Sequence, residues 1–181
     1  MTYPLVQAKN YTRANRTAID LIVIHTMEAP EKPGKARQVA EWFASDNAPQ
    51  ASAHYCVDEA EVVQSVLDQD VAWHAPGANR NGIGIEHAAY AKFGPDDWHQ
   101  PGPQAMLWRS AKLVSELCAK YGIPNVKLSV ADLKAGLRGI CGHKDITDAF
   151  NGGKGHWDPG TFVWDEYMAM VDQCVSGQVG G

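Results

Sequence analysis

Short apolar runs rich in β-branched residues set the framework of this chain. The clearest run covers residues 18–24 and ends at His25. Because the run lacks polar alternation, it is typical of a strand buried on both faces of a sheet. We expect five more strands, at residues 51–57, 61–67, 71–74, 82–88 and 137–141.

Helical patterns alternate with these strands. Residues 36–45, 104–121 and 164–175 each repeat apolar side chains at helical spacing. In the first helix the apolar positions are Val39, Ala40, Trp42 and Phe43. Strands that alternate with helices predict an α/β fold, here a mixed central β-sheet flanked by helices on both faces.

The length predicts one domain. A chain of 181 residues can bury one sizeable core but is too short for two ordinary domains. We expect residues 1–175 to form this domain and residues 176–181 to be a linker-like tail. Glycine and proline are frequent in residues 93–103 and 148–160, which predicts two irregular loops near a binding site.

Charge and hydropathy exclude several classes of function. Sixteen Lys and Arg residues against 21 Asp and Glu residues give a formal net charge of −5. Nucleic-acid binding is not expected, because phosphate contacts need a basic face. The apolar runs are far shorter than the ~20 residues of a membrane span, and the N-terminus lacks the apolar core of a signal peptide. Membrane association is therefore not expected. We also expect a monomer.

Histidines and one aspartate point to a metal site. His25 ends the first strand, His143 follows the last strand, and Asp158 lies in the second glycine-rich loop. Three ligands from separate elements are typical of a catalytic zinc site, which leaves a fourth position to water. Four scattered cysteines without a CxxC pair argue against a disulfide framework.

Alternative ligands remain open on the residues alone. Asp158 precedes Pro-Gly, so its side chain can instead cap a turn. Cys141 is a rival third ligand, because residues two apart on a strand share a face with each other. His156, two residues before Asp158, is another alternative.

Six sequence blocks occur in a fixed order between about residues 19 and 162. They read LIVIHTME, ASAHYCVD, VAWHAPG, GIGIEHA, ICGHKDIT and HWDPG. In these blocks the chain resembles the type-2 N-acetylmuramoyl-L-alanine amidases, zinc enzymes that include phage endolysins, wall-recycling amidases and animal peptidoglycan recognition proteins. The resemblance implies Zn²⁺ as cofactor, with His25, His143 and Asp158 as its ligands.

The chemistry also needs a base and a group that stabilises the oxyanion. Glu86 ends an apolar strand, and partial burial would raise its pKa into the range of a general base. The resemblance implies that His156 stabilises the oxyanion, at a position where the family usually has a lysine. Lys154 is a nearby alternative cation. Some family members use a tyrosine before the histidine of the second block, but here that residue is Ala53.

Substrate contacts are expected beside this centre. Strand alternation allows His54 to point toward the cleft, and Trp73 and His74 match the substrate-lining block of the family. The amide of Asn79 could read peptide groups of the substrate. Weaker candidates are Asn81 for hydrogen bonding and Trp98 and Trp157 for stacking on sugars.

The resemblance implies hydrolysis of the amide between the lactyl group of N-acetylmuramic acid and L-alanine in peptidoglycan. It further implies the catalytic module of a phage endolysin, made without a signal peptide in the cytoplasm of an infected bacterium and acting on the cell wall. Two alternatives stay open. One is a non-catalytic peptidoglycan recognition module without metal, and the other is a zinc peptidase that cleaves the stem peptide.

Overall fold

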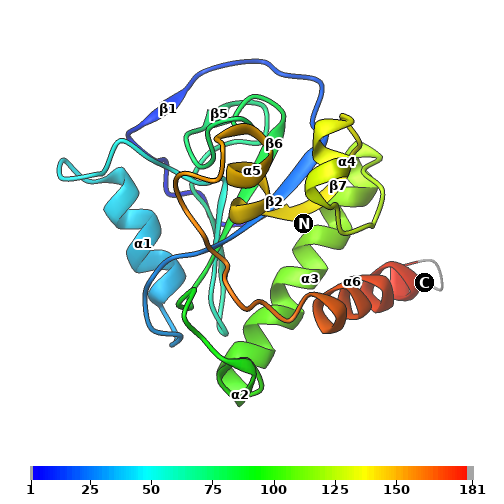
Figure 1. Cartoon of the computed structure of the whole chain (residues 1–181). Helices are drawn as coiled ribbons and strands as arrows, with labels where there is room; N and C mark the ends of the chain where they lie inside the picture. Colours follow the sequence, from blue (N-terminus) through cyan, green and yellow to red (C-terminus); the bar gives the residue numbers. More distant parts are fainter. Residues whose placement is uncertain (1, 179–181) are drawn as a thin grey trace.

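The protein is built around a central mixed sheet. The structure, a computed structural model, describes residues 2–178 (Figure 1). The five strands of the sheet are β2 (Leu21–Thr26), β3 (Tyr55–Val57), β4 (Val62–Gln64), β6 (Gly82–His87) and β7 (Gly139–Gly142). Their order is β4-β3-β6-β2-β7, and only the pairing of β3 with β4 is antiparallel. The predicted mixed sheet is therefore confirmed.

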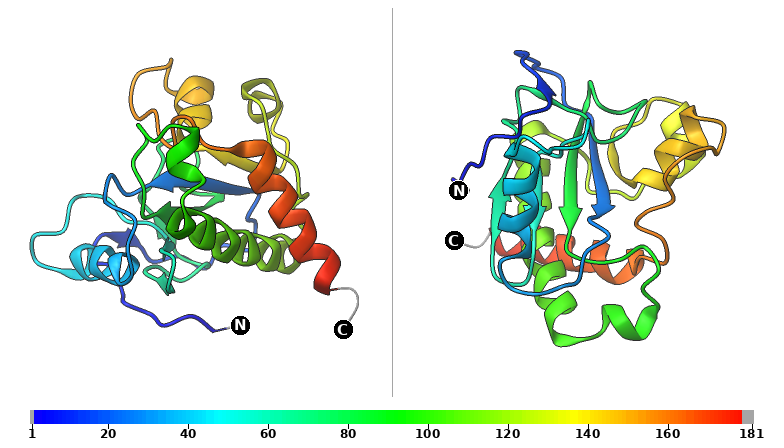
Figure 2. Two further views of the ribbon diagram at one scale, coloured as in Figure 1. Left: turned by 90° about the horizontal axis from the view of Figure 1, so that it is seen from below. Right: turned by 90° about the vertical axis from the view of Figure 1, so that its left-hand side faces the viewer.

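Helices cover both faces of this sheet. They are α1 (Lys35–Ala44), α2 (Pro95–Trp98), α3 (Pro101–Tyr121), α4 (Val130–Lys134), α5 (His143–Phe150) and α6 (Trp164–Gln178). Helices α3 and α6 lie side by side on one face (Figure 2). Helices α1, α4 and α5 pack on the other face. The predicted placement of helices on both faces is confirmed.

Alternation along the strands assigns side chains to the two faces. Ile22 and Ile24 of β2 join the core under α3 and α6, whereas Leu21 and Val23 pack with α4 and α5. Helix α1 packs its own small cluster against β3 and β4. Between the α1 cluster and α5, near the carboxyl ends of the strands, this face of the sheet carries polar side chains instead of an apolar core.

One strand prediction needs correction, and one strand was missed. The segment 71–74 is a strand only at β5 (Val71–Ala72), and it pairs with β1 (Tyr11–Thr12) in a separate two-stranded sheet. It is thus not part of the central sheet. The sequence did not reveal β1, because two residues are too few for a periodic pattern.

The helices differ from the predictions in three regions of the chain. Residues 93–103 contain α2 and the start of α3, because proline fits the first turn of a helix. Helix α5 covers the start of the loop expected at 148–160, and α4 was not predicted. Helix α6 extends to Gln178 into the predicted tail, whose residues 179–181 lie outside the described residues.

Within residues 2–178, no helix has both the length and the apolar character to cross a bilayer.

Candidate metal centre

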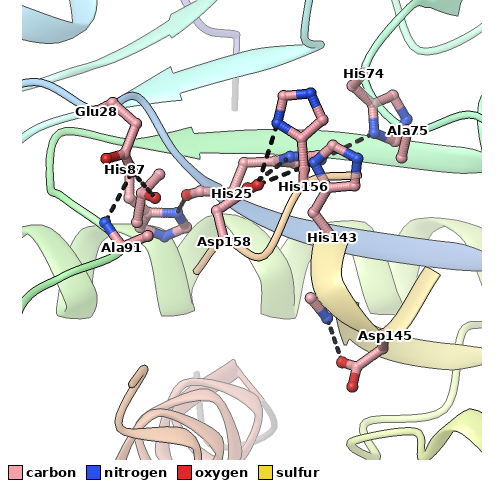
Figure 3. A network of polar contacts seen from close by, with 12 residues as sticks. His25, Glu28, His74, Ala75, His87, Ala91, His143, Asp145, His156 and Asp158 are labelled. Atoms are coloured by element: carbon pink, nitrogen blue, oxygen red, sulfur yellow. Dashed lines mark hydrogen bonds and ion pairs between the residues drawn. The ribbon is translucent and has the colours of Figure 1, made fainter. Parts of the chain in front are cut away.

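Two histidines and one aspartate meet at the carboxyl end of the sheet. The Nδ1 atom of His25 lies 3.2 Å from one carboxylate oxygen of Asp158, and the Nδ1 atom of His143 lies 3.1 Å from the other. Figure 3 shows both imidazoles pointing at this carboxylate. One potential ligand atom from each residue lies within 4.8 Å of the others. All three residues are buried.

The fold brings these residues together from three elements. His25 lies in β2, and the parallel partner strand β7 ends directly before His143, the first residue of α5. The side chain of Asp145 accepts a hydrogen bond from the Gly142 amide and so caps this helix. The Lys144 amide donates to the carbonyl of Asp158 at 2.8 Å, which fastens the glycine-rich loop to α5.

The loop that carries Asp158 is also fixed from the other side. Gly160 has a φ of 64°, and a Cβ atom there would collide with the carbonyl of Ala91. The Ala91 amide in turn donates to Glu28 Oε1 at 2.8 Å. Only glycine allows this contact between the two segments, because it combines left-handed backbone with the absence of a side chain.

The protonation states fit a divalent cation. Burial lowers the pKa of His25, which favours the neutral imidazole that binds metals. Burial acts to raise the pKa of Asp158, but hydrogen bonds from His143 and His25 outweigh it and hold this pKa well below its usual range. Two imidazole nitrogens and one carboxylate are a donor set that suits Zn²⁺.

Glu86 lies beside the three candidate ligands. It pairs directly with His25 across β6 and β2, so both side chains are on the same face. Its Oε2 atom is buried and has no hydrogen-bond partner among residues 2–178. Burial, followed by the negative charges of Asp158 and Glu28, raises the pKa of Glu86 to about 8. A carboxyl group in this state is suited to proton transfer near neutral pH.

His156 lies at the solvent side of the centre. Its ring stacks on His143 with 4.6 Å between ring centroids, and its Nδ1 atom is 3.8 Å from Asp158 Oδ1. Its side chain is 74% exposed, unlike the three buried candidate ligands. This position is open to a substrate, whereas Lys154 does not line the groove described below.

Cys141, the alternative third ligand, points elsewhere. It is fully buried among apolar residues under α4 and α5, and this burial raises the pKa of its thiol. The prediction assumed that Cys141 and His143 share one strand face. It fails because β7 ends at Gly142 and His143 already belongs to a helix.

A groove of about 270 Å³ leads to the centre. Its lining includes His25, His143, His156, Asp158 and Glu86. Two exposed tryptophans also line it, Trp42 with 49% and Trp73 with 37% of its surface exposed. Trp73 donates from its indole nitrogen to Thr12 Oγ1 at 2.9 Å, so the small two-stranded sheet holds its ring in place.

Trp42 was missed as a site residue. The sequence placed it on the apolar face of its helix, but the buried residues of α1 are Ala36, Ala40 and Phe43. These positions follow the i, i+4, i+7 stripe of a helix, and Trp42 falls outside it. This offset was the signal in the sequence that could have identified an exposed tryptophan.

The other predicted substrate residues lie deeper than expected. His54 is fully buried and does not line the groove, so the expectation that it points into the cleft is not met. The side-chain oxygen of Asn79 accepts hydrogen bonds from the amides of His74 and Ala75, which makes it part of a turn. His74 does line the groove, but its Nδ1 atom lies 3.0 Å from His25 Nε2.

The weaker candidates differ in their exposure to a substrate. Trp98 is fully buried against Phe93 and Phe162, so it cannot stack on a sugar. Trp157 is 54% exposed next to His156 in the sequence. Asn81 reaches the carboxylate of Asp20 at 3.4 Å and does not line the groove.

The sequence profile of the N-acetylmuramoyl-L-alanine amidases matches residues 15–161, most of the chain and all of the site. The chain belongs to the N-acetylmuramoyl-L-alanine amidase family. This amidase is therefore a hydrolase of peptidoglycan. N-acetylmuramoyl-L-alanine amidase A of Achromobacter lyticus is 29% identical over 175 residues, which cover 91% of this chain and 89% of that protein.

Solved structures share the fold of this amidase. The Staphylococcus aureus hydrolase AmiA, in complex with its ligand, superimposes with a TM-score of 0.74 at 14% identity, covering 99% of this chain and 86% of that one. A mutant endolysin from Bacillus subtilis gives 0.58 at 20% identity, covering 94% and 99%. At these identities the likeness concerns the fold alone.

Proposed function

We propose that this amidase depends on zinc and cleaves the amide between the lactyl group of N-acetylmuramic acid and L-alanine. His25, His143 and Asp158 are the proposed ligands. The observation that carries the proposal is the convergence of two imidazole Nδ1 atoms on one buried carboxylate, beside the unpartnered carboxyl group of Glu86. When bound, Zn²⁺ supplies a Lewis acid that polarises the scissile carbonyl and acidifies water.

The side chains around the ligands perform the proton transfers. Glu86 takes a proton from the attacking water and returns it to the amine that leaves. Its pKa near neutrality allows one carboxyl group to do both. His156 donates a hydrogen bond to the oxyanion of the tetrahedral intermediate. Trp73 and Trp42 form the apolar wall on which the substrate lies.

The role of His156 predicts a selective loss of turnover. His156→Ala should lower kcat by roughly 10- to 100-fold and leave bound zinc unchanged, because it removes an exposed oxyanion donor and keeps all three proposed zinc ligands. His156→Lys should keep most of the activity. Lys154→Ala tests the alternative cation and should change kcat less than twofold. Steady-state kinetics on a purified muropeptide measure all three. Equal losses in His156→Ala and Lys154→Ala would contradict this assignment.

The proposed reaction is tested by the products. Purified muropeptide is incubated with the zinc-loaded amidase, with a chelator, and with zinc restored after chelation, and the fragments are identified by mass spectrometry. We expect intact glycan and intact stem peptide, formed only when zinc is present. Fragments cut within the stem peptide would support the zinc peptidase. Binding of muropeptide without metal and without turnover would support the recognition module.

We further propose a role as the catalytic module of a phage endolysin, made in the cytoplasm of an infected bacterium. The fold shared with the Bacillus subtilis endolysin supports this role. Added to isolated cell walls, the amidase should lower their turbidity in a zinc-dependent manner. Cleavage of soluble muropeptides without any effect on isolated walls would argue for a recycling enzyme instead.

A further inference from the structure

His74 is a buried side chain that contacts a proposed zinc ligand. The residue is 8% exposed, and its Nδ1 atom lies 3.0 Å from the Nε2 atom of His25. The opposite nitrogen of His25, Nδ1, faces Asp158. An imidazole that ligates zinc through Nδ1 carries its proton on Nε2. His25 therefore needs a hydrogen-bond acceptor at the place where His74 Nδ1 lies.

We infer that His74 is a positioning residue, which accepts a hydrogen bond from His25 Nε2 and so fixes the tautomer and the orientation of this ligand for zinc. The inference rests on the proposed zinc site. It replaces the expected substrate contact of His74 by a role within the protein. Partners of metal-binding histidines are usually carboxylates or carbonyls, and here an imidazole fills the role.

The second nitrogen of His74 supports this role. Once Nδ1 accepts, Nε2 carries the proton, and this atom is buried without a hydrogen-bond partner among residues 2–178. An unpaired buried donor costs about 1–3 kcal/mol. An apolar side chain would avoid this cost. The contact between His74 Nδ1 and His25 is thus the feature that accounts for a histidine at this place.

The strand beneath His74 is shaped to accommodate the ring. A Cβ atom at Gly84 would lie 2.5 Å from His74 Cγ, and one at Gly82 would lie 3.5 Å from its Cε1. The His74 ring therefore packs directly on the backbone of β6 at these two glycines. The Gly84 amide donates to His54 Nδ1 at 3.0 Å, and this bond helps to hold the backbone of β6 at this point.

Further contacts fix the two ends of the pair. The side chain of Asn79 accepts from the His74 amide at 2.9 Å and so holds its backbone. On the opposite face of the sheet, His87 Nδ1 donates to the carbonyl of His25 at 3.0 Å (Figure 3). With both backbones held, the His25 ring is oriented by His74 Nδ1 on its Nε2 side and by Asp158 on its Nδ1 side.

Isosteric variants test the inference through zinc affinity. The side-chain oxygen of asparagine can take the place of Nδ1, whereas the amide of glutamine reaches the place of Nε2. His74→Asn should keep the zinc dissociation constant within about threefold of the unsubstituted protein. His74→Gln and His74→Leu should weaken zinc binding roughly 10- to 100-fold. Gly84→Ala, which displaces the ring, should weaken it to a similar degree. Competition with a chromophoric chelator measures all four.

The outcomes separate this inference from the zinc site itself. Equal zinc affinity in His74→Asn and His74→Gln would overturn the inference, as would tight binding by His74→Leu. If His74→Leu does not fold by circular dichroism, the comparison of Asn with Gln still decides. Absence of zinc binding by the unsubstituted protein would instead remove the proposed function, and the inference with it.

Discussion

Glu86→Gln is expected to bind zinc as tightly as the unsubstituted protein and to lose roughly 100-fold or more in kcat. Glutamine has nearly the same shape but cannot take a proton from water. The change also removes a carboxyl group whose Oε2 atom has no partner, so the fold loses no hydrogen bond at that atom. Steady-state kinetics on muropeptide and metal analysis of the same sample measure both quantities.

A matched control distinguishes proton transfer from a general effect of charge in the groove. Glu28 also lines the groove, but its Oε1 atom already accepts hydrogen bonds from Thr26 Oγ1 and the Ala91 amide. Glu28→Gln should therefore lower kcat by less than about tenfold. Comparable losses in the two variants would show that Glu86 acts through its charge. Full activity of Glu86→Gln would exclude it as the base.

His143→Ala is expected to abolish zinc binding and to destabilise the metal-free protein. The variant removes one proposed ligand and also one of the two buried histidines whose Nδ1 atoms lie within 3.2 Å of the carboxylate of Asp158. Loss of such a partner costs about 1–3 kcal/mol. In addition, zinc should no longer raise the melting temperature, because metal binding is linked to folding. Thermal melts with and without zinc measure both effects.

Lys144, the residue next to His143, provides the control variant for these melting experiments. Lys144 forms an exposed ion pair with Asp148, and such pairs contribute about 0.5 kcal/mol or less. Lys144→Ala should keep full zinc binding and nearly the same melting temperature. A zinc-dependent rise in melting temperature that persists in His143→Ala would remove His143 from the ligand set.

The sequence predicted the core of the fold where periodicity is strong. The apolar runs around Ile22 and Ile83 and the long stripe of α3 are buried on the expected elements. Short elements were missed for a physical reason. β1 has two residues, and α5 begins with the polar side chains of His143 and Asp145, which serve the site and its cap rather than a core.

The convergence of His25, His143 and Asp158 was easier to predict than the arrangement of the residues around them. His25 and His143 follow from the rule that residues at the carboxyl ends of parallel strands meet. Strand alternation predicted that His54 points into the cleft, but His54 is fully buried and does not line the groove. Alternation along a strand does not reveal which segments cover a side chain. The contact between His74 and His25 depends on a turn held by Asn79, which no local pattern indicates.

The central claim is that His25, His143 and Asp158 together bind one zinc ion. Anomalous diffraction from crystals of the zinc-loaded amidase, recorded on both sides of the zinc absorption edge, tests this claim most directly. We expect one strong peak within bonding distance of His25, His143 and Asp158. A peak at other residues, or none at this place in protein that retains zinc, would contradict the assignment of these three side chains.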